Sequence, residues 1–402
     1  MSVPRERLPL LVLGALFVGY AASYFHRADL AALAPLWAAD PARAAMRAAL
    51  PDIASLGMLV YAFGKLAGGL LADRFGGRRM FVIALAGAGL AELLALQAAT
   101  PAAFAACRVA GMAVLGCAWP ALGGVVAAVS PRARLATAMA FASQSYLVGD
   151  AAVRALYAAV VANGGRDAHV LGTAATGLLV ASAVVGVVLF VTRARSSPDG
   201  ALPPEAVASA VGGAAPLGVL APMNFGLAMV RETLSLWTPL LLVEACAFAA
   251  ADAVRASLLL PLVSGAGALV AGACADRHPR ALLAVTAAPA LAGALALGGL
   301  ACDAAPTATT LVVGLAFVSA MMAMPMTLAS GLLPLRGPAL GRSRRLGIVD
   351  GAGSFGAVLA GGAMARAYAA WGVAGLFGTL GLVALASAAL AVVVHRVTRR
   401  RT

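Results

Sequence analysis

The chain has 402 residues, of which 62% are hydrophobic and only 11% are charged, and its formal net charge is +13. A soluble globular protein is usually about 45–50% apolar and about one-quarter charged, so this composition excludes a water-soluble fold. The positive charge does not indicate nucleic-acid binding, because the arginines lie in short clusters between apolar stretches and form no single basic face or tail.

Apolar stretches of about 20 residues, the length that crosses the hydrocarbon core of a bilayer, recur along the whole chain. Six are expected in the first half, near residues 9–36, 53–72, 80–98, 102–129, 137–162 and 170–192. Six more are expected in the second half, near residues 217–244, 253–275, 281–301, 307–331, 347–367 and 372–395. The sequence therefore predicts an all-α membrane protein with twelve transmembrane helices in two six-helix pseudo-repeats.

One segment, between the sixth and seventh stretches, has the Pro-, Gly- and Ser-rich composition of a linker. We expect an N-terminal bundle over residues 1–192, a cytoplasmic linker over 193–218 and a C-terminal bundle over 219–402. The first apolar stretch could be a signal peptide, but it continues past any cleavage point to Trp37, so we interpret it as the first span. Arginines gather after the even-numbered spans, which predicts cytoplasmic termini in a multi-pass protein of the cell inner membrane.

The two halves share a sequence repeat. The pattern G-x3-D-R at residues 69–74 recurs at residues 272–277, and Arg27 in the first span is matched by Arg231 in the seventh at nearly the same offset. The stretch GGLLADRFGGRR, from residue 68, resembles the loop-two signature of the major facilitator superfamily. This resemblance implies the fold of those transporters, whose two halves have the same orientation in the membrane.

The repeated acidic residues are candidates for a cytoplasmic latch. An acidic residue at a helix end that faces neighbouring arginines can form an ion pair that breaks as the two halves move. The alternative is that the arginines only set the topology, which does not account for the acids. The expected latch residues are Asp73, Arg74, Arg78, Asp276 and Arg277.

Charged residues inside the spans are functional candidates, because a charge in the hydrocarbon costs at least ~2.5–3.5 kcal/mol on insertion scales. Arg27 and Arg231 lie at similar depths, and two guanidiniums facing one cavity would bind a phosphate or a carboxylate. Neutralisation by Asp29 and by Glu232 is the alternative. Adjacent residues on a helix point about 100° apart, so we expect Glu232 to lie on a different face from Arg231.

A lysine and several aromatic residues extend this candidate site. Lys65 is the only lysine among the 29 Lys and Arg residues, which suggests that a compact ammonium is needed there. Tyrosines lie at helical spacing from Arg27 and from Lys65 and can place hydroxyls beside the charges. The predicted substrate-binding residues are Arg27, Arg231, Lys65, Tyr20, Tyr24, Tyr61, Trp119 and Tyr146.

These residues carry a closer resemblance, to the organophosphate:phosphate antiporters, which include the bacterial glycerol-3-phosphate and hexose-phosphate transporters. The stretch GYAASYFHRADLAALAP, from residue 19, is similar to the first helix of that family, in which an arginine binds phosphate. YAFGK, CAWP and VRETLSLWTPLLLVE, from residues 61, 117 and 230, are similar to its second, fourth and seventh helices. The resemblance implies exchange of phosphate for a phosphorylated metabolite, with the two arginines as the phosphate site.

The sequence also departs from that family. In the fifth span, Tyr146 stands where the family has a histidine, and Asp150 stands where it has a glycine. Arg154 follows Asp150 at i, i+4, which predicts an internal ion pair, and Glu92 and Arg108 are expected to pair structurally. The candidates for coupling or ion pairing are His26, Asp150, Arg154, Glu232 and Asp350.

Three functions remain open on the sequence. The first is exchange of phosphate and an organophosphate. The second is transport of a carboxylate, coupled to protons through Asp150, Asp350 or His26, because two arginines suit a dicarboxylate as well as a phosphate. The third is a membrane sensor of sugar phosphates. No catalytic, metal or cofactor constellation is recognised, so we expect no enzyme and no cofactor, and a monomer whose partners are a small anion and the lipid bilayer.

Overall fold

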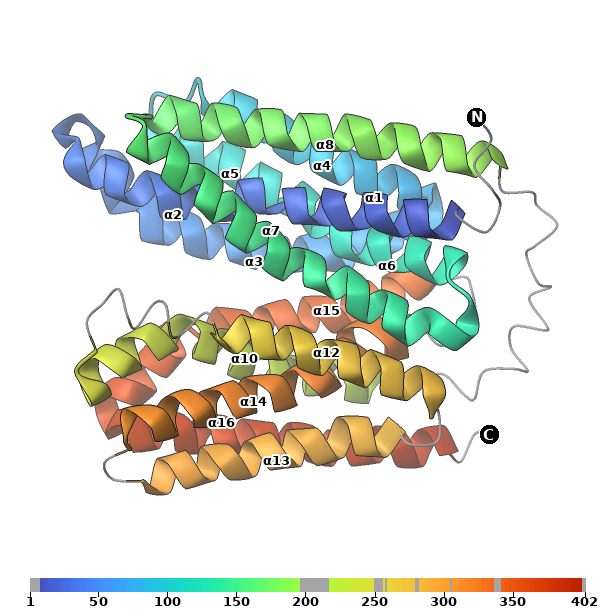
Figure 1. The fold of residues 1–402 in the computed structure, drawn as a ribbon. Helices are drawn as coiled ribbons and strands as arrows, with labels where there is room; N and C mark the ends of the chain where they lie inside the picture. Colours follow the sequence, from blue (N-terminus) through green and yellow to red (C-terminus); the bar gives the residue numbers. More distant parts are fainter. Residues whose placement is uncertain are drawn as a thin grey trace. The chain divides into compact units, whose positions relative to one another are not determined.

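The computed structural model describes residues 8–195, 217–248, 256, 259–278, 282–303, 306–335 and 341–399. All regular secondary structure within these ranges is helical (Figure 1). Most of the expected linker lies outside the described residues. The expected spans can therefore be compared with helices throughout most of the two halves.

The first half contains the six expected spans. Its helices are α1 (Leu8–Ala22), α2 (Tyr24–Ala39), α3 (Ala44–Phe75), α4 (Gly77–Ala95), α5 (Pro101–Gly116), α6 (Ala118–Val129), α7 (Leu135–Ala162) and α8 (Asp167–Arg195). The first span consists of α1 and α2, and the fourth consists of α5 and α6. The second span begins nine residues before its expected start, because the polar turns around Arg47 and Asp52 are already helical.

The second half contains the other six spans. Its helices are α10 (Leu217–Cys246), α12 (Leu259–Arg277), α13 (Leu282–Cys302), α14 (Ala308–Thr327), α15 (Arg342–Leu359) and α16 (Gly362–Arg399). Within α16, Gly372 has φ 63° and ψ −159°, a conformation that glycine adopts readily. This break separates the end of the eleventh span from the twelfth, so the twelve-helix prediction is confirmed.

Two spans are broken beside predicted site residues, and each break has a local cause. Between α1 and α2, the Ser23 hydroxyl donates to the Tyr20 carbonyl at 2.6 Å, a bond that competes with the helix ladder. Between α5 and α6, Cys117 lies three residues before Pro120, which cannot donate a backbone hydrogen bond and crowds the preceding turn. The breaks lie close in sequence to Tyr24, Arg27 and Trp119.

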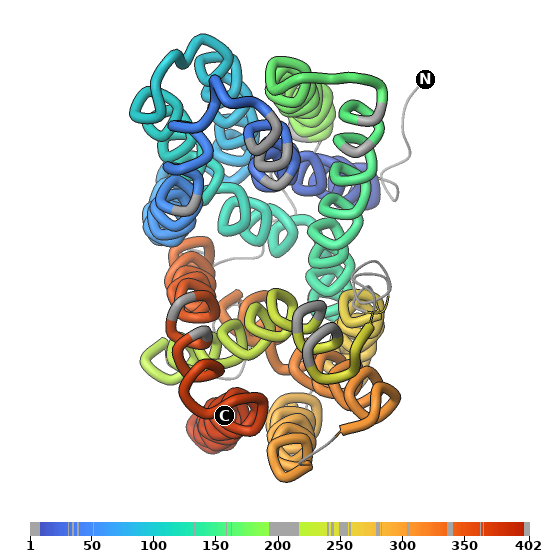
Figure 2. Tube along the Cα trace, turned by 90° about the vertical axis from the view of Figure 1, so that its left-hand side faces the viewer, coloured from blue at the N-terminus to red at the C-terminus, as the bar shows by residue number. Residues whose placement is uncertain are grey.

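Contacts divide the chain into two compact units, which we describe separately. The first unit comprises Met1–Ser130, Gln144–Pro204 and Ala339–Gly347, and the second comprises Pro131–Ser143, Glu205–Pro338 and Ile348–Thr402. The first residues of α7 thus belong to the second unit and the first residues of α15 to the first. The division into an N-terminal bundle over residues 1–192, a linker over 193–218 and a C-terminal bundle over 219–402 stays a prediction. Figure 2 shows the helices of each unit packed side by side.

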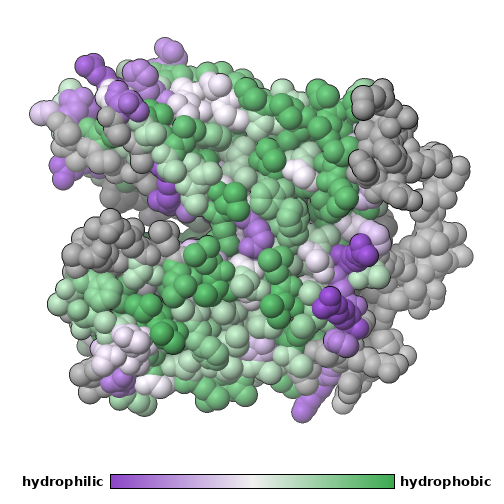
Figure 3. Space-filling model, viewed as in Figure 1, coloured by the Kyte–Doolittle hydropathy of each residue, from purple (hydrophilic) through white to green (hydrophobic). Residues whose placement is uncertain are grey.

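The outer surface of the helices is strongly apolar. Large hydrophobic side chains point outward, among them Phe190, which is 75% exposed, and Leu382, which is 70% exposed. Hydrophobic residues dominate the face that Figure 3 shows. Eight stretches of the described chain are each long and apolar enough to cross a membrane. Exposed apolar area on this scale requires a lipid environment.

Glycines allow close helix packing inside the first unit. A Cβ atom at Gly64 in α3 would lie 2.3 Å from the Ala113 carbonyl oxygen in α5, and one at Gly116 would lie 2.6 Å from the Tyr61 carbonyl oxygen. Small residues of this kind let two backbones approach within a membrane. The contact fixes α3, which carries Tyr61 and Lys65, against α5.

Candidate functional site

The first unit gathers the predicted cations around aromatic rings. The Arg27 guanidinium carbon lies 4.5 Å from the centroid of the Tyr24 ring and 5.2 Å from that of Tyr61. Nη1 of Arg27 also donates to the Tyr24 hydroxyl at 2.9 Å. The Lys65 ammonium lies 4.7 Å from the centroid of the same Tyr61 ring. Two basic side chains from two spans therefore meet at one tyrosine.

Two further predicted residues adjoin this group. The Tyr20 hydroxyl lies 3.4 Å from that of Tyr61, and the rings of Tyr20 and Trp119 have centroids 5.1 Å apart. The side chains of Tyr20, Tyr61 and Trp119 are all buried, and Lys65 is only 8% exposed. We call Tyr20, Tyr24, Arg27, Tyr61, Lys65 and Trp119 the cationic cluster. Tyr146 is half-buried and packs against the hydrophobic core that includes Tyr24.

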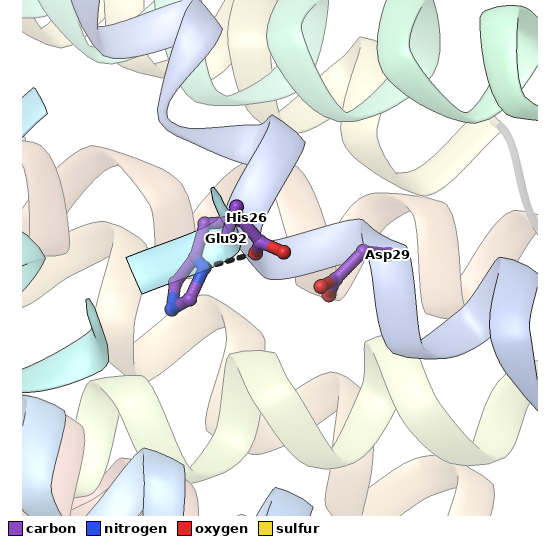
Figure 4. Close-up of side chains that lie close together, drawn as sticks. All are labelled: His26, Asp29 and Glu92. Carbon is purple, nitrogen blue, oxygen red and sulfur yellow. Dashed lines mark hydrogen bonds and ion pairs between the residues drawn. The ribbon is translucent and has the colours of Figure 1, made fainter. Parts of the chain in front are cut away.

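A second group, which we call the buried tetrad, lies on the other side of α2. It consists of His26 and Asp29 from α2, Glu92 from α4 and Arg108 from α5, and each of these side chains is at most 3% exposed. Nη1 of Arg108 donates to Asp29 Oδ2 at 2.8 Å and to Glu92 Oε1 at 3.1 Å. Nδ1 of His26 contacts Glu92 Oε1 (Figure 4).

Backbone groups complete the tetrad. Arg108 also donates to the His26 carbonyl oxygen, and His26 Nε2 lies 3.4 Å from the Arg108 carbonyl oxygen. The Tyr157 hydroxyl from α7 donates to the Phe25 carbonyl at 2.6 Å. These side chains hold the first turn of α2, where the break at Ser23 leaves carbonyls outside a continuous helix.

The tetrad was only partly expected from the sequence. Glu92 and Arg108 do pair, as predicted. Asp29, considered as a partner of Arg27, instead pairs with Arg108, because residues two apart on a helix lie on nearly opposite faces. The link between His26 and the Glu92–Arg108 pair was missed. The available signal was that His26 and Asp29, at i and i+3, share one face of a span.

Arg231, the predicted counterpart in the second unit, differs from expectation. Its guanidinium is 31% exposed and contacts the carboxylate of Glu232, which is 36% exposed. The different helix faces of Arg231 and Glu232 were expected to keep the two side chains apart, and this expectation is wrong. The long arginine side chain can fold back to the adjacent residue. Asp350 in α15 is buried in the second unit.

The ion pair predicted in the fifth span is present. Arg154 Nε donates to Asp150 Oδ1 at 2.7 Å, but these side chains are 56% and 37% exposed. The pair is therefore not internal to its unit, contrary to the expectation. Alternation of polar and apolar residues does not show which face of a membrane helix is covered, since lipid-facing and buried positions are both apolar.

The predicted latch acids bind helix N-termini. Asp73 accepts hydrogen bonds from the backbone N–H groups of Ser343 and Arg344, both at 3.0 Å, at the start of α15. Asp276 accepts from the N–H groups of Ala136, at 3.0 Å, and Thr137, at 2.8 Å, at the start of α7. The acids were expected to face arginines. Free N–H groups and the positive end of the helix dipole make these positions favourable for a carboxylate.

The arginines of the predicted latch lie elsewhere. Arg78 donates to the Leu189 carbonyl at 2.8 Å and to the Thr192 hydroxyl at 3.2 Å, near the end of α8. The exposed Arg74 stacks on the ring of Phe75, and Arg277 is exposed at the end of α12. The contacts of Arg78 connect α4 to α8 inside the first unit, and a latch that opens during transport stays a prediction.

Comparison with known proteins defines the class. The sequence profile of the Major Facilitator Superfamily matches residues 12–297, so the chain belongs to this superfamily of membrane transporters. No curated protein sequence gives a significant match. Hence the chain is a multi-pass membrane protein of a transporter family.

Solved structures share the fold over almost the whole chain. The human organic anion transporter MFSD10 (TETRAN) is 18% identical, with a TM-score of 0.73 over 97% of this chain and 100% of that chain. The transporter FucP in the outward conformation is 17% identical, with a TM-score of 0.68 over 98% of each chain. The proton:xylose symporter XylE is 15% identical, with a TM-score of 0.65 over 98% and 95%. At these identities the likeness concerns the fold alone.

Proposed function

We propose that this protein is a secondary active transporter of a small anion, an antiporter of phosphate and an organophosphate. The observation that carries the proposal is the placement of Arg27 and Lys65 against the single ring of Tyr61. Arginine and lysine are the side chains that bind phosphate, one through a fork of N–H donors and the other as a point charge. The protein is proposed to lie in the cell inner membrane, with both termini in the cytoplasm.

The surrounding tyrosines suit the same ligand. The hydroxyls of Tyr20 and Tyr61 lie 3.4 Å apart, and either can donate to an oxyanion next to the two cations. The buried aromatic rings lower the local dielectric, which strengthens the attraction between an anion and the guanidinium. Arg231 of the second half is proposed to bind the same anion during part of the transport cycle, after it leaves the carboxylate of Glu232.

A carboxylate is the second candidate substrate. A guanidinium binds carboxylate and phosphate with the same two-donor geometry, so the cationic cluster accommodates both. The human neighbour in fold is an organic anion transporter, which supports including organic acids among the probes. A sensor would bind the anion without moving it across the membrane.

The test is exchange of labelled phosphate in liposomes that contain the purified protein and are preloaded with phosphate. We expect uptake by the wild type and loss of uptake in Arg27→Ala and Arg231→Ala. Arg166→Ala serves as the matched control, because it removes an exposed loop arginine outside the cluster and should leave the rate unchanged. Circular dichroism confirms that each variant is folded.

The alternatives give different results in the same liposomes. Uptake of labelled succinate but not phosphate, lost in the same two variants, would replace the phosphate proposal with the carboxylate one. Binding of phosphate without exchange would indicate a sensor. Exchange that survives both arginine substitutions would contradict the site itself.

A further inference from the structure

The buried tetrad carries a charge imbalance. Asp29 and Glu92 contribute two negative charges when ionised, and Arg108 contributes one positive charge. With a neutral His26, the group would hold one net negative charge at full burial, inside a membrane protein. An unbalanced buried charge costs several kcal/mol, so the group is expected to hold one additional proton.

The histidine geometry points to the same proton. Nε2 of His26 faces the Arg108 carbonyl oxygen at 3.4 Å and can only donate to it, so a proton lies on Nε2. In a neutral ring, Nδ1 is then an acceptor, yet it contacts the carboxylate oxygen Oε1 of Glu92. Two acceptors repel each other at contact. Nη1 of Arg108 also lies 2.9 Å from Nδ1 and can only donate to it, so Nδ1 stays an acceptor. A second proton on Glu92 then turns the contact into a hydrogen bond.

The carboxylates add an independent indication. Ligand atoms of His26, Asp29 and Glu92 lie within 4.8 Å of one another, and two like charges this close favour protonation of one. The second oxygen of Glu92, Oε2, is buried and has no hydrogen-bond partner among the described residues. Figure 4 shows Glu92 between the other two, with one oxygen at the imidazole and one turned toward Asp29.

A metal ion is a poorer occupant than a proton. Nη1 of Arg108 lies within 3.1 Å of Asp29 Oδ2, Glu92 Oε1 and His26 Nδ1, so a cation already sits among the atoms that would hold the metal. The other ionisable groups that face the tetrad from packed helices, among the described residues, are Tyr157 and Cys107. Both are ordinarily uncharged at neutral pH, so neither corrects the imbalance.

The tetrad and the cationic cluster share one helix. Arg27 lies between His26 and Asp29 in α2, in the first turn after the break at Ser23. A change in the charge of the tetrad therefore acts on the same helical turn that presents Arg27 to Tyr24 and Tyr61. Movement of α2 would then link the two groups.

We propose that His26, Asp29, Glu92 and Arg108 form a proton-binding site that couples anion transport to the movement of one proton. The proton enters the tetrad from water, resides on the His26–Glu92 contact and returns to water on the other side of the membrane. The existence of the proton site follows from the tetrad alone. The coupling rests on the proposed function, because it requires that an anion binds at Arg27.

The first experiment counts protons on the full-length protein in lipid nanodiscs, by titration with an indicator dye between about pH 5 and pH 8. The wild type is expected to release one proton more per chain, as the pH rises, than Glu92→Gln or Asp29→Asn. Either amide removes one carboxylate and leaves a neutral group. Asp167→Asn, whose carboxylate pairs with Arg43 at 2.6 Å, is the matched control and should follow the wild type. Equal release by the wild type and both tetrad variants would overturn the site.

The second experiment measures labelled phosphate in liposomes, with equal pH on both sides or with acid outside. We expect accumulation driven by the pH gradient in the wild type, and a loss of that accumulation in Glu92→Gln while phosphate exchange persists. Accumulation that is undiminished in Glu92→Gln, or absent in a wild type that exchanges phosphate, would overturn the coupling. If the wild type does not exchange phosphate at all, the proposed function fails, and the proton count still decides the site.

Discussion

Arg108 is the residue on which the buried tetrad depends, because it is the only group there that is positive at every physiological pH. It binds both carboxylates and a backbone carbonyl of α2. Sequence spacing predicted which residues share a face of one helix, and the contact of Tyr61 with Lys65 followed from it. Spacing cannot show which residue of another span meets that face, so the pairing of Asp29 with Arg108 could not be predicted.

We predict that Arg108→Ala lowers the free energy of unfolding by about 3–5 kcal/mol, because the buried acidic side chains of Asp29 and Glu92 lose their cation. The measurement is denaturant unfolding in detergent micelles, followed by circular dichroism. Arg43→Ala breaks a partly exposed ion pair with Asp167 and is expected to cost less than about 1 kcal/mol. Adding Asp29→Asn to Arg108→Ala should recover part of the loss. A loss of the same size in Arg43→Ala would contradict this account.

At the scale of elements, the spans are predictable and their breaks are less so. Length and hydropathy located twelve spans, but the interruption at Ser23 depends on one hydroxyl bond to Tyr20. The approach of α3 to α5 depends on Gly64 and Gly116, but glycines are frequent along the whole chain, which has 45 of them. The sequence does not show which helices pack together, so a glycine at a helix contact cannot be told from one that faces lipid.

We predict opposite effects for two glycine substitutions in spans. Gly64→Ala places a methyl group 2.3 Å from the Ala113 carbonyl oxygen, and the displaced backbone is expected to cost about 1–3 kcal/mol. Gly14→Ala, in α1, has nothing within 4 Å of the new atom, and the better helix propensity of alanine should stabilise it by up to about 1 kcal/mol. Thermal unfolding in micelles compares the two. Equal midpoints would show that α3 and α5 are less closely packed than described.

At the scale of the whole molecule, the sequence repeat is matched by a repeated contact. Asp73 of the second span caps the start of the eleventh, and Asp276 of the eighth caps the start of the fifth. The repeat predicted that the two acids are equivalent. It did not predict backbone amides as their partners. The free N–H groups at a helix start belong to the backbone, so the pattern of charged side chains does not reveal them.

We predict that each acid protects one helix start. Asp73→Ala should speed amide hydrogen exchange at Ser343 and Arg344, and Asp276→Ala should speed it at Ala136 and Thr137, with a cost of about 1 kcal/mol for each lost cap. Hydrogen exchange detected by mass spectrometry resolves the two segments, so each variant is the control for the other. Faster exchange of both segments in one variant would indicate a wider disturbance than the loss of a cap.

The tetrad also has a consequence for how the protein is made. Its members come from the first, third and fourth spans, so ribosomes must synthesise the chain through Arg108 before the charges of His26, Asp29 and Glu92 can be balanced. Until then, the first three spans carry unpaired acids that are costly in lipid. A nascent chain truncated before α5 should therefore remain at the insertion machinery, and one extended beyond α5 should leave it as a stable membrane intermediate.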